Sequence, residues 1–380
     1  MERASATRRR NILLYAASTV DPNALYATRF WAPDPFIFVR TASGKRVYVM
    51  SDLEIDRARR TSNAHRVLPL KRYTERASAR SRRPHPADVI AEVLRDLRIT
   101  SVTVPANFPV GVADRLRKRR VRVTPVAAIF PERVRKSAEE VRHVREAMRI
   151  TEKGLAAAID VLRRSKVRGG WVVHGSRRLT ADHLRQVANE VIFASGCVPA
   201  QTIVAPGQQG CDPHETGSGP IRAGAPVIID IFPRSEKTGY FGDMTRTVVK
   251  GRPSETVRRM YDAVLAGQRL ALRRIRAGVD AREVHRAILD LFESRGFSTG
   301  MSGGRMQGFF HGTGHGLGLE IHEPPRIALD GDVLEAGMVV TVEPGLYYYP
   351  HGGVRIEDTV LVTSRGIRNL TRFPKFLEVD

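Results

Sequence analysis

The sequence predicts a mixed α/β protein with two domains, a small one over residues 1–130 and a larger one over residues 131–380. In the first part, short apolar runs alternate with a segment of helical period, which is typical of a small α/β domain. The second part begins with a long capped helix and continues into strand-like apolar runs that contain acidic side chains. A chain of 380 residues is long enough to bury a core in each of two domains.

The first domain begins with a ragged basic segment, Met1–Arg10, and we expect a buried strand over Ile12–Ser18. This apolar run resembles a signal peptide only weakly, because it has about the minimum length for one. Ala87–Leu97 places its apolar residues at helical spacing and predicts a helix. Three further runs predict strands, namely Phe36–Val39, Arg46–Met50 and Ser101–Val104.

A linker over residues 127–136, which contains Pro131, leads into the second domain. Ser137 and Glu140 have the spacing of a capping box, so a long helix is expected from there to about Arg164. Further helices are predicted to start at the N-cap residues Thr180, Ser254 and Asp280, the last again with a glutamate three residues later. The strands with acidic residues follow or separate these helices.

The composition is strongly basic, with a formal net charge of +22 and a pI near 10.8, which admits a nucleic-acid partner. Arginines occur along the whole chain, however, and the densest patch, Lys71–Arg83, has Tyr73 as its one aromatic residue. We therefore favour an Arg-rich soluble enzyme without a nucleic-acid partner. No run of 18 apolar residues predicts a membrane span. Two cysteines, Cys197 and Cys211, lie outside any Cys-x-x-Cys pattern and fit a reducing cytoplasm.

Residues 311–326 combine three histidines with four glycines. The histidines are His311, His315 and His322. Histidine is the commonest metal ligand and titrates near neutral pH, and glycine lets the backbone approach a ligand closely. Packing alone does not explain a segment so rich in both, so we predict a functional site here.

Four carboxylates in strand-like runs accompany this segment. Asp230 and Asp243 lie on the two arms of a predicted β-hairpin, and Glu343 and Glu357 follow in later runs. A carboxylate in an apolar run costs several kcal/mol unless it is paired or coordinated. Hard carboxylates with one imidazole suit Mn²⁺, Co²⁺, Fe²⁺ or Zn²⁺, and two such ions activate a water for hydrolysis of an amide. A single aspartate at a solvent-facing strand end is the alternative, but it does not account for all four.

Four motifs in this order resemble the pita-bread metallopeptidases, the family of aminopeptidase P, prolidase and methionine aminopeptidase. They are Asp243-Met-Thr-Arg-Thr, His311-Gly-Thr-Gly-His315-Gly, Thr341-Val-Glu343-Pro-Gly and Arg355-Ile-Glu357-Asp, and the resemblance covers residues 137–380. It implies a pita-bread (creatinase/aminopeptidase) catalytic domain behind a creatinase-like α/β domain.

The resemblance also implies a set of five metal ligands, Asp230, Asp243, His315, Glu343 and Glu357. Asp243 and Glu357 would bridge two ions, Asp230 would chelate one, and His315 and Glu343 would bind the other, with Glu343 as proton acceptor for the attacking water. The two aspartates lie two residues further apart than is usual in the family. This insertion preserves side-chain alternation, so we expect a longer turn and an intact site.

Four further residues match substrate-contacting positions of the family. His214 falls where the family places a histidine near the substrate, and His322 matches one that hydrogen-bonds the substrate or the tetrahedral intermediate, so both are expected to assist catalysis. His311 would contact the substrate or support a ligand. Arg326 is placed to bind the C-terminal carboxylate of a dipeptide, since a guanidinium clamps a carboxylate bidentately. An ordinary loop histidine and one more surface arginine remain the alternatives for His214 and Arg326.

Within the family, the extra N-terminal domain disfavours methionine aminopeptidase, and the intact ligands disfavour creatinase-like relatives. The short N-terminal domain and the run through Arg326 favour a prolidase, an Xaa-Pro dipeptidase, slightly over aminopeptidase P. The implied substrate is a small peptide with proline at its second position, and the implied protein is a cytoplasmic homodimer with two divalent ions, Mn²⁺ foremost. A metal-free pita-bread binding protein and a hydrolase of a non-peptide amide remain alternatives.

Overall fold

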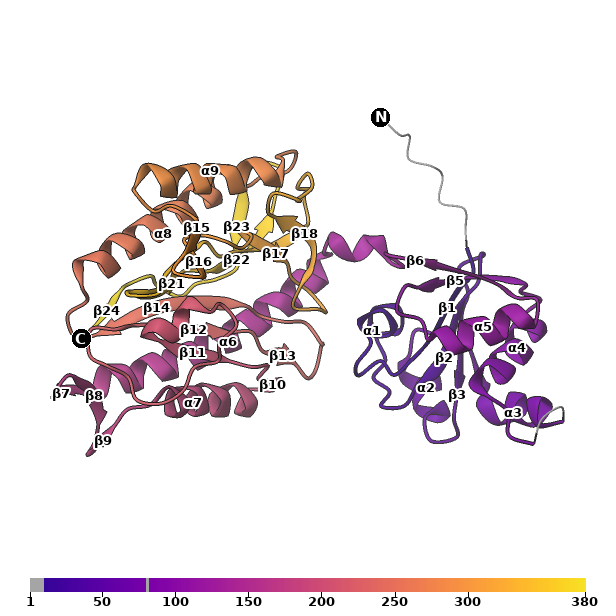
Figure 1. Cartoon of the computed structure of the whole chain (residues 1–380). Coiled ribbons are helices and arrows are strands. Elements are labelled where there is room, and N and C mark those ends of the chain that lie inside the picture. The colour runs from indigo at the N-terminus through magenta and orange to yellow at the C-terminus, as the bar shows by residue number, and fades with distance from the viewer. Residues whose placement is uncertain (1–9, 80–81) are drawn as a thin grey trace. The chain divides into compact units, whose positions relative to one another are not determined.

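The computed structural model describes residues 10–79 and 82–380 (Figure 1). Residues 1–9 of the predicted ragged start, and residues 80 and 81 of the basic patch Lys71–Arg83, lie outside the described residues. The chain divides into two compact units, Met1–Pro131 and Glu132–Asp380. The assignment of residues 1–130 and 131–380 as two domains stays a prediction.

The N-terminal unit is built on a six-stranded sheet of order β4-β3-β2-β1-β5-β6. Its strands are β1 (Ile12–Ala16), β2 (Phe36–Arg40), β3 (Arg46–Met50), β4 (Arg66–Pro69), β5 (Ser101–Pro105) and β6 (Arg122–Val126). Strand β2 runs antiparallel to both neighbours, whereas the other pairs are parallel. All four strands predicted in this unit are confirmed, and β4 and β6 were not predicted because each has few apolar residues.

Five helices cover this sheet, α1 (Pro22–Thr28), α2 (Ile55–Thr61), α3 (Leu70–Ser78), α4 (Pro86–Asp96) and α5 (Val110–Lys118). The predicted helix over 87–97 is confirmed as α4. Successive strand residues face opposite sides of the sheet. Leu13 and Ile37 therefore lie in one hydrophobic cluster with α3, α4 and α5, while Ile12 and Phe38 lie in the other with α1 and α2.

The 3₁₀ turn η1 (Pro131–Val134) includes the last residue of the first unit and the first residues of the second. The second unit contains four helices, α6 (Ala138–Arg164), α7 (Ala181–Ala194), α8 (Glu255–Arg274) and α9 (Ala281–Ser294). The predicted capping box at Ser137 and Glu140 is confirmed, with both reciprocal hydrogen bonds formed. Thr180, Ser254 and Asp280 are the N-caps of the other three helices, as predicted. Asp280 accepts from the second helical position, Arg282, so its cap is not the predicted box.

Two sheets form the centre of this unit, with the pair α8–α9 and the pair α6–α7 on either side of the strands (Figure 1). One sheet has the order β11-β12-β14-β24, from Ile203–Pro206, Pro226–Ile231, Met244–Lys250 and Glu378–Val379. The other has the order β18-β17-β19-β22-β23, from Glu323–Ile327, Gly314–Gly316, Val339–Val342, Asp358–Val362 and Ile367–Asn369. A hairpin of β20 (Gly345–Tyr348) and β21 (Gly352–Arg355) accompanies them.

Shorter strands and one turn complete the unit. They are β7 (Lys166–Arg168), β8 (Trp171–His174) and β9 (Arg177–Arg178) in one ribbon, the pair β10 (Cys197–Val198) and β13 (Arg234–Ser235), the hairpin β15 (Gly300–Ser302) and β16 (Arg305–Gln307), and the turn η2 (Gly207–Cys211). Within residues 10–79 and 82–380, no helix has the length and apolar character to cross a membrane.

The strands β12 and β14 are antiparallel neighbours, with Asp230 opposite Thr245. We predicted a longer turn between these strands. The connection instead contains a further strand, β13, which pairs with β10 outside the hairpin. The connection then returns against α6 at Gly242, where a Cβ atom would meet Thr151 Oγ1 at 2.4 Å. The backbone N–H of Asp243 points to Met148 Sδ at 3.1 Å. The packing against α6 therefore fixes the backbone position of Asp243.

Candidate metal centre

The acidic residues of the site lie mostly at strand ends. Asp230 lies within β12, Asp243 directly precedes β14, Glu343 directly follows β19, and Glu357 lies between β21 and β22. We predicted all four inside strand-like runs. For Asp243, Glu343 and Glu357, the end positions let the backbone turn the carboxylate toward a shared centre, which the strict alternation of a continuous strand does not allow.

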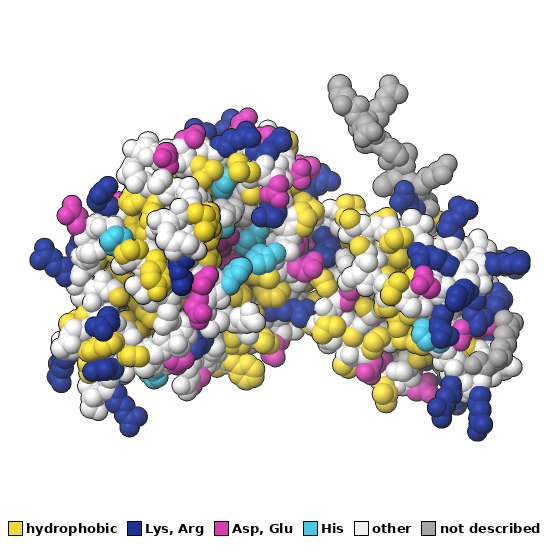
Figure 2. Space-filling model, viewed as in Figure 1, with side chains coloured by type: hydrophobic (Ala, Val, Ile, Leu, Met, Phe, Trp, Pro, Cys, Tyr) yellow, Lys and Arg dark blue, Asp and Glu magenta, His cyan; other side chains and the backbone are white. Residues whose placement is uncertain are grey.

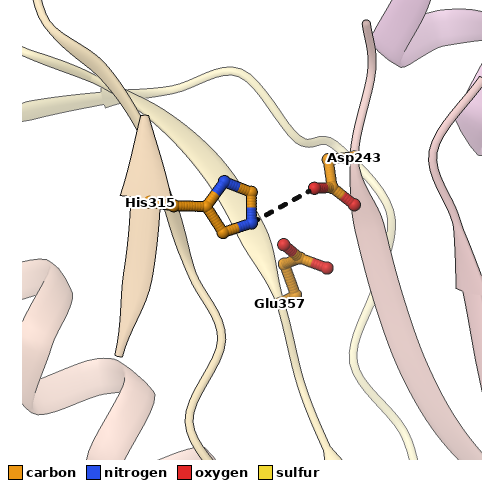
Figure 3. Close-up of side chains that lie close together, drawn as sticks. All are labelled: Asp243, His315 and Glu357. Atoms are coloured by element: carbon orange, nitrogen blue, oxygen red, sulfur yellow. Dashed lines mark ion pairs between the residues drawn. The ribbon is translucent and has the colours of Figure 1, made fainter. Parts of the chain in front are cut away.

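Three of the predicted ligands, Asp243, His315 and Glu357, offer atoms that all lie within 4.8 Å of one another (Figure 3). His315 Nε2 is 3.7 Å from Asp243 Oδ2 and 3.4 Å from Glu343 Oε1, so Glu343 borders the same group. The three side chains converge from β17, from the start of β14 and from the segment between β21 and β22. The structure thus brings together residues more than 100 positions apart in the sequence.

His315 is held in one orientation. Its neighbours Gly314 and Gly316 pass so close to other strands that added Cβ atoms would meet Thr341 O at 2.0 Å and Pro324 O at 2.2 Å. The Nδ1 atom lies 3.1 Å from the carbonyl oxygen of Gly316, so a proton on Nδ1 leaves the Nε2 lone pair directed at the carboxylates. Burial lowers the pKa of His315, which favours the neutral imidazole that a metal requires.

Glu357 is fixed through both its side chain and its backbone. Its Oε2 accepts a hydrogen bond from Thr245 Oγ1 at 2.7 Å, and its N–H donates to the carbonyl of Thr245 at 3.0 Å. Its own carbonyl accepts from Arg246 Nη1 at 2.5 Å. Thr245 and Arg246 lie on β14, which starts directly after Asp243, so the strand that follows one candidate ligand holds another in place.

Asp230 is paired with a buried arginine. Arg355 Nη2 donates to Asp230 Oδ2 at 2.7 Å, and Arg355 Nη1 donates to Tyr347 Oη at 3.0 Å. Tyr347 Oη lies 2.8 Å from His311 Nε2, which completes a chain of hydrogen bonds from His311 to Asp230. Burial raises the pKa of Tyr347 to about 12 and lowers that of His311 to about 3, so both groups are neutral near pH 7.

The site has a strong excess of buried negative charge. Burial is the main cause that raises the pKa of Asp243 and of Glu357 well above their ordinary values, and the neighbouring carboxylates add to it. Burial likewise raises the pKa of Glu343 to about 7. Asp230 Oδ1 is buried and, within the described residues, has no hydrogen-bond partner. Divalent cations would neutralise this repulsion and complete the coordination of Oδ1, so the donor set fits hard metal ions.

Without metal, the free energy of unfolding is expected to fall as the pH rises from about 4.5 to about 7. The folded protein binds protons at Glu343 more tightly than the unfolded chain does, because its pKa is about 7 against an ordinary 4.5. The stabilisation is therefore complete below pH 4.5 and lost through pH 7, on the order of 3 kcal/mol from this group. Urea unfolding with a chelator at pH 5 and pH 8 measures it. A metal-free protein that is more stable at pH 8 would contradict the assignment, and added Mn²⁺ should stabilise most at pH 8.

The remaining predicted residues border the group at its exposed side. The ring centroid of His322 lies 4.4 Å from that of His315 in an edge-to-face arrangement. Arg326 is directly opposite His315 on the neighbouring strand and therefore on the same face, but it is exposed and pairs with Asp330 at 3.5 Å. His214 is exposed in a turn. In the described part of the chain, neither His214 nor Arg326 hydrogen-bonds or ion-pairs with the five ligand candidates.

The loop that presents His322 is anchored by a buried ion-pair cluster. Glu323 Oε2 is 3.1 Å from Lys136 Nζ, and Glu323 Oε1 is 2.8 Å from Arg133 Nη2. The side chains of Lys136 and Glu323 are 1% and 4% exposed, so neither charge is stable there without the other. The cations Lys136 and Arg133 lower the pKa of Glu323 against the opposing effect of burial.

Four residues of the site escaped sequence-based prediction, namely Thr245, Arg246, Tyr347 and Arg355. Three of them lie inside motifs that we quoted for their acidic residues, so a signal was present. Their partners are distant in sequence, however, and no local pattern indicates that a threonine or an arginine supports a carboxylate 112 residues away.

The sequence profile of metallopeptidase family M24 matches residues 142–364. The Xaa-Pro dipeptidase of Pyrococcus furiosus is 35% identical over 247 residues, which cover 63% of this chain and 64% of the relative, somewhat less than two thirds of its length. The Xaa-Pro dipeptidase of Pyrococcus horikoshii is 32% identical over 286 residues, which cover 72% of this chain and 74% of the relative.

The fold of the chain also resembles that of a solved prolidase. The crystal structure of the prolidase from Pyrococcus horikoshii OT3 superposes with a TM-score of 0.78 at 26% identity, over 97% of this chain and 95% of that one. The superposition therefore includes both units of the chain, whereas the family profile lies within the second.

Proposed function

Since the chain belongs to metallopeptidase family M24, we propose that it is a metal-dependent peptidase that hydrolyses Xaa-Pro dipeptides. The observation that carries the proposal is the convergence of Asp243, His315 and Glu357, with Glu343 at their border. The names of the similar Pyrococcus proteins support the substrate class, a dipeptide with proline at its second position.

We infer that two divalent ions are held by Asp230, Asp243, His315, Glu343 and Glu357, and that Mn²⁺ is the preferred metal. When bound, such ions polarise the peptide carbonyl and lower the pKa of a water molecule. Glu343 accepts a proton from the water while the oxygen of that water attacks the carbonyl carbon. The C–N bond then breaks, and the proton passes to the proline nitrogen that leaves.

The surrounding residues bind and orient the peptide in this proposal. His322, whose ring contacts that of His315, donates a hydrogen bond to the oxygen of the former carbonyl. His214 and His311 line the substrate side, and His311 is tied to Tyr347 and Arg355. Arg326 pairs with the C-terminal carboxylate of the dipeptide once it exchanges its exposed partner Asp330.

The test is hydrolysis of an Xaa-Pro dipeptide beside the matching Xaa-Pro-Xaa tripeptide, with added Mn²⁺ and with a chelator. We expect metal-dependent cleavage of the dipeptide with at least tenfold preference. Arg326→Ala should raise KM for the dipeptide about tenfold and leave kcat largely unchanged, since it removes a ground-state contact. Arg365→Ala, in an exposed turn, is the matched control and should change neither constant.

The other outcomes assign the other functions that the sequence admits. Comparable cleavage of the tripeptide would indicate aminopeptidase P, and equal effects of Arg326→Ala on both substrates would remove the carboxylate clamp. No cleavage of either peptide would leave a non-peptide amide or a binding role. A homodimer in the cytoplasm belongs to the proposal as well, and light scattering of the purified protein tests the oligomeric state.

A further inference from the structure

The N-terminal sheet collects cations at one edge. Because β1, β3, β4, β5 and β6 run parallel, their amino ends lie at the same edge, where the antiparallel β2 ends. The turns at this edge and the strand starts beside them are residues 40–46, 62–66, 97–101 and 118–122, and none of these residues is Asp or Glu. We call this surface the amino edge. Apart from Arg119, which pairs with Asp88, its exposed cations are Lys45, Arg66, Arg98, Lys118, Arg120 and Arg122.

These six cations are available for a partner. Within the described residues, none of the six has a carboxylate within ion-pair distance. The nearby carboxylates are already engaged, since Asp88 pairs with Arg119 at 2.6 Å and Asp114 pairs with Arg117 at 2.9 Å. The amino edge therefore presents positive charge that the fold itself does not neutralise.

Two of the cations occupy positions that favour glycine. Arg98, between α4 and β5, and Arg120, between α5 and β6, have φ angles of 57° and 62° in the left-handed region. An L-residue there costs free energy that glycine avoids. The negative ends of the preceding helices attract a cation and offset part of this cost, but that effect does not extend to Lys45 or Arg66, which precede strands. Helix capping therefore does not explain the positive charge at Lys45 and Arg66.

The charge of the whole chain is concentrated in the same unit. Residues 1–131 contain 26 Lys and Arg against 11 Asp and Glu, which is +15 of the net +22 on about a third of the chain. Figure 2 shows dark-blue side chains gathered at the margin of this unit that α4 and α5 cover. Loops at the opposite edge of the sheet contain acidic residues at Asp21, Asp34 and Asp52, and the exposed Arg82 and Arg83 precede Pro84 beside that edge.

We propose that the amino edge binds the phosphate backbone of a nucleic-acid duplex without reading its sequence. Strands lie about 4.8 Å apart, so a six-stranded edge is on the order of 25 Å wide and faces several phosphates. Its turns contain no Phe, Tyr or Trp on which unpaired bases could stack. They also expose no large apolar side chain for insertion into a membrane. This partner departs from the interpretation favoured from composition, in which arginines occur along the whole chain of an enzyme without a nucleic-acid partner.

The test is fluorescence anisotropy of a labelled 20-base-pair duplex with the full chain at 50 to 200 mM salt. The edge variant is Lys45→Gln, Arg66→Gln, Arg98→Gly and Arg120→Gly, and the two glycines suit the left-handed turns, so the fold is retained. The matched control, Arg168→Gln, Arg177→Gln, Arg273→Gln and Arg286→Gln, removes the same charge from exposed sites in the second unit. Circular dichroism and peptidase activity should be unchanged in both.

We expect the wild type to bind the duplex with an affinity that falls steeply with salt. Four lost phosphate contacts should reduce the slope of log K against log salt by about 3.6 in the edge variant. The control should change it by less than 1. Equal losses in both variants, or no duplex binding at 50 mM salt, would overturn the proposal. The protein could instead bind vesicles of anionic phospholipid more strongly than the duplex, with the vesicle binding lost in the edge variant. That result would overturn the proposal in favour of a membrane surface.

Discussion

Glu343→Gln is expected to lower kcat at least a thousandfold at saturating Mn²⁺. The amide keeps the shape of the side chain but accepts no proton from the attacking water, and general base catalysis alone contributes about 10²- to 10⁴-fold. The carboxylate is also a candidate ligand, because its Oε1 lies 3.4 Å from His315 Nε2. The substitution thus removes the base and one negative charge at a single atom position. Steady-state kinetics on an Xaa-Pro dipeptide measure the loss.

A matched control and a metal analysis separate these two roles. Glu335→Gln changes an exposed glutamate that pairs with Arg135 at 3.4 Å, and its kcat should stay within twofold. Elemental analysis of the purified Glu343→Gln protein then reports the metal content. Retained metal with lost turnover assigns Glu343 the role of base, and lost metal assigns it the role of ligand. Turnover near that of the wild type at metal saturation would show that Glu343 has neither role.

The parts of this fold that local patterns encode were predictable. The capping box at Ser137 and Glu140 involves residues three positions apart, and the strand Arg46–Met50 shows its pattern in five consecutive side chains. The glycines around His315 likewise indicated a close approach of backbone to a site. In each case the interactions that decide the structure are short-range, so the sequence pattern and the physical cause coincide.

The rest depends on contacts that no local pattern encodes. The connection from β12 to β14 contains β13, which pairs with β10 across some 36 residues, and the turn residues give no sign of it. The position of Asp243 depends on the packing of Gly242 against α6. For Arg326, the sequence places a cation beside the site, whereas its exposure and its pair with Asp330 emerge only from the fold.

Arg246→Met is expected to lower the free energy of unfolding by about 3 to 5 kcal/mol. The Arg246 side chain is buried, and its guanidinium donates five hydrogen bonds to five acceptors. Nη2 donates to Asp358 Oδ1 at 2.9 Å, and the other acceptors are four backbone carbonyls, of Thr245, Glu357, Phe373 and Pro374. Methionine fills similar volume but leaves these acceptors buried without donors, which is the costly way to break such a network. Urea unfolding of the metal-free protein measures the loss.

Arg258→Met is the matched control, because it also removes an arginine that hydrogen-bonds a carboxylate. Arg258 reaches Glu378 at 2.6 and 2.9 Å, but the pair is 44% and 40% exposed, so the loss should be only a small fraction of that expected for Arg246→Met. Lys375 Nζ still contacts Asp358 Oδ2 in Arg246→Met and limits the damage to that carboxylate. The carbonyl of Glu357 loses its donor, however, so Mn²⁺ affinity should fall together with stability. A variant as stable as the control would mean that water replaces the guanidinium, and that Glu357 is held by Thr245 alone.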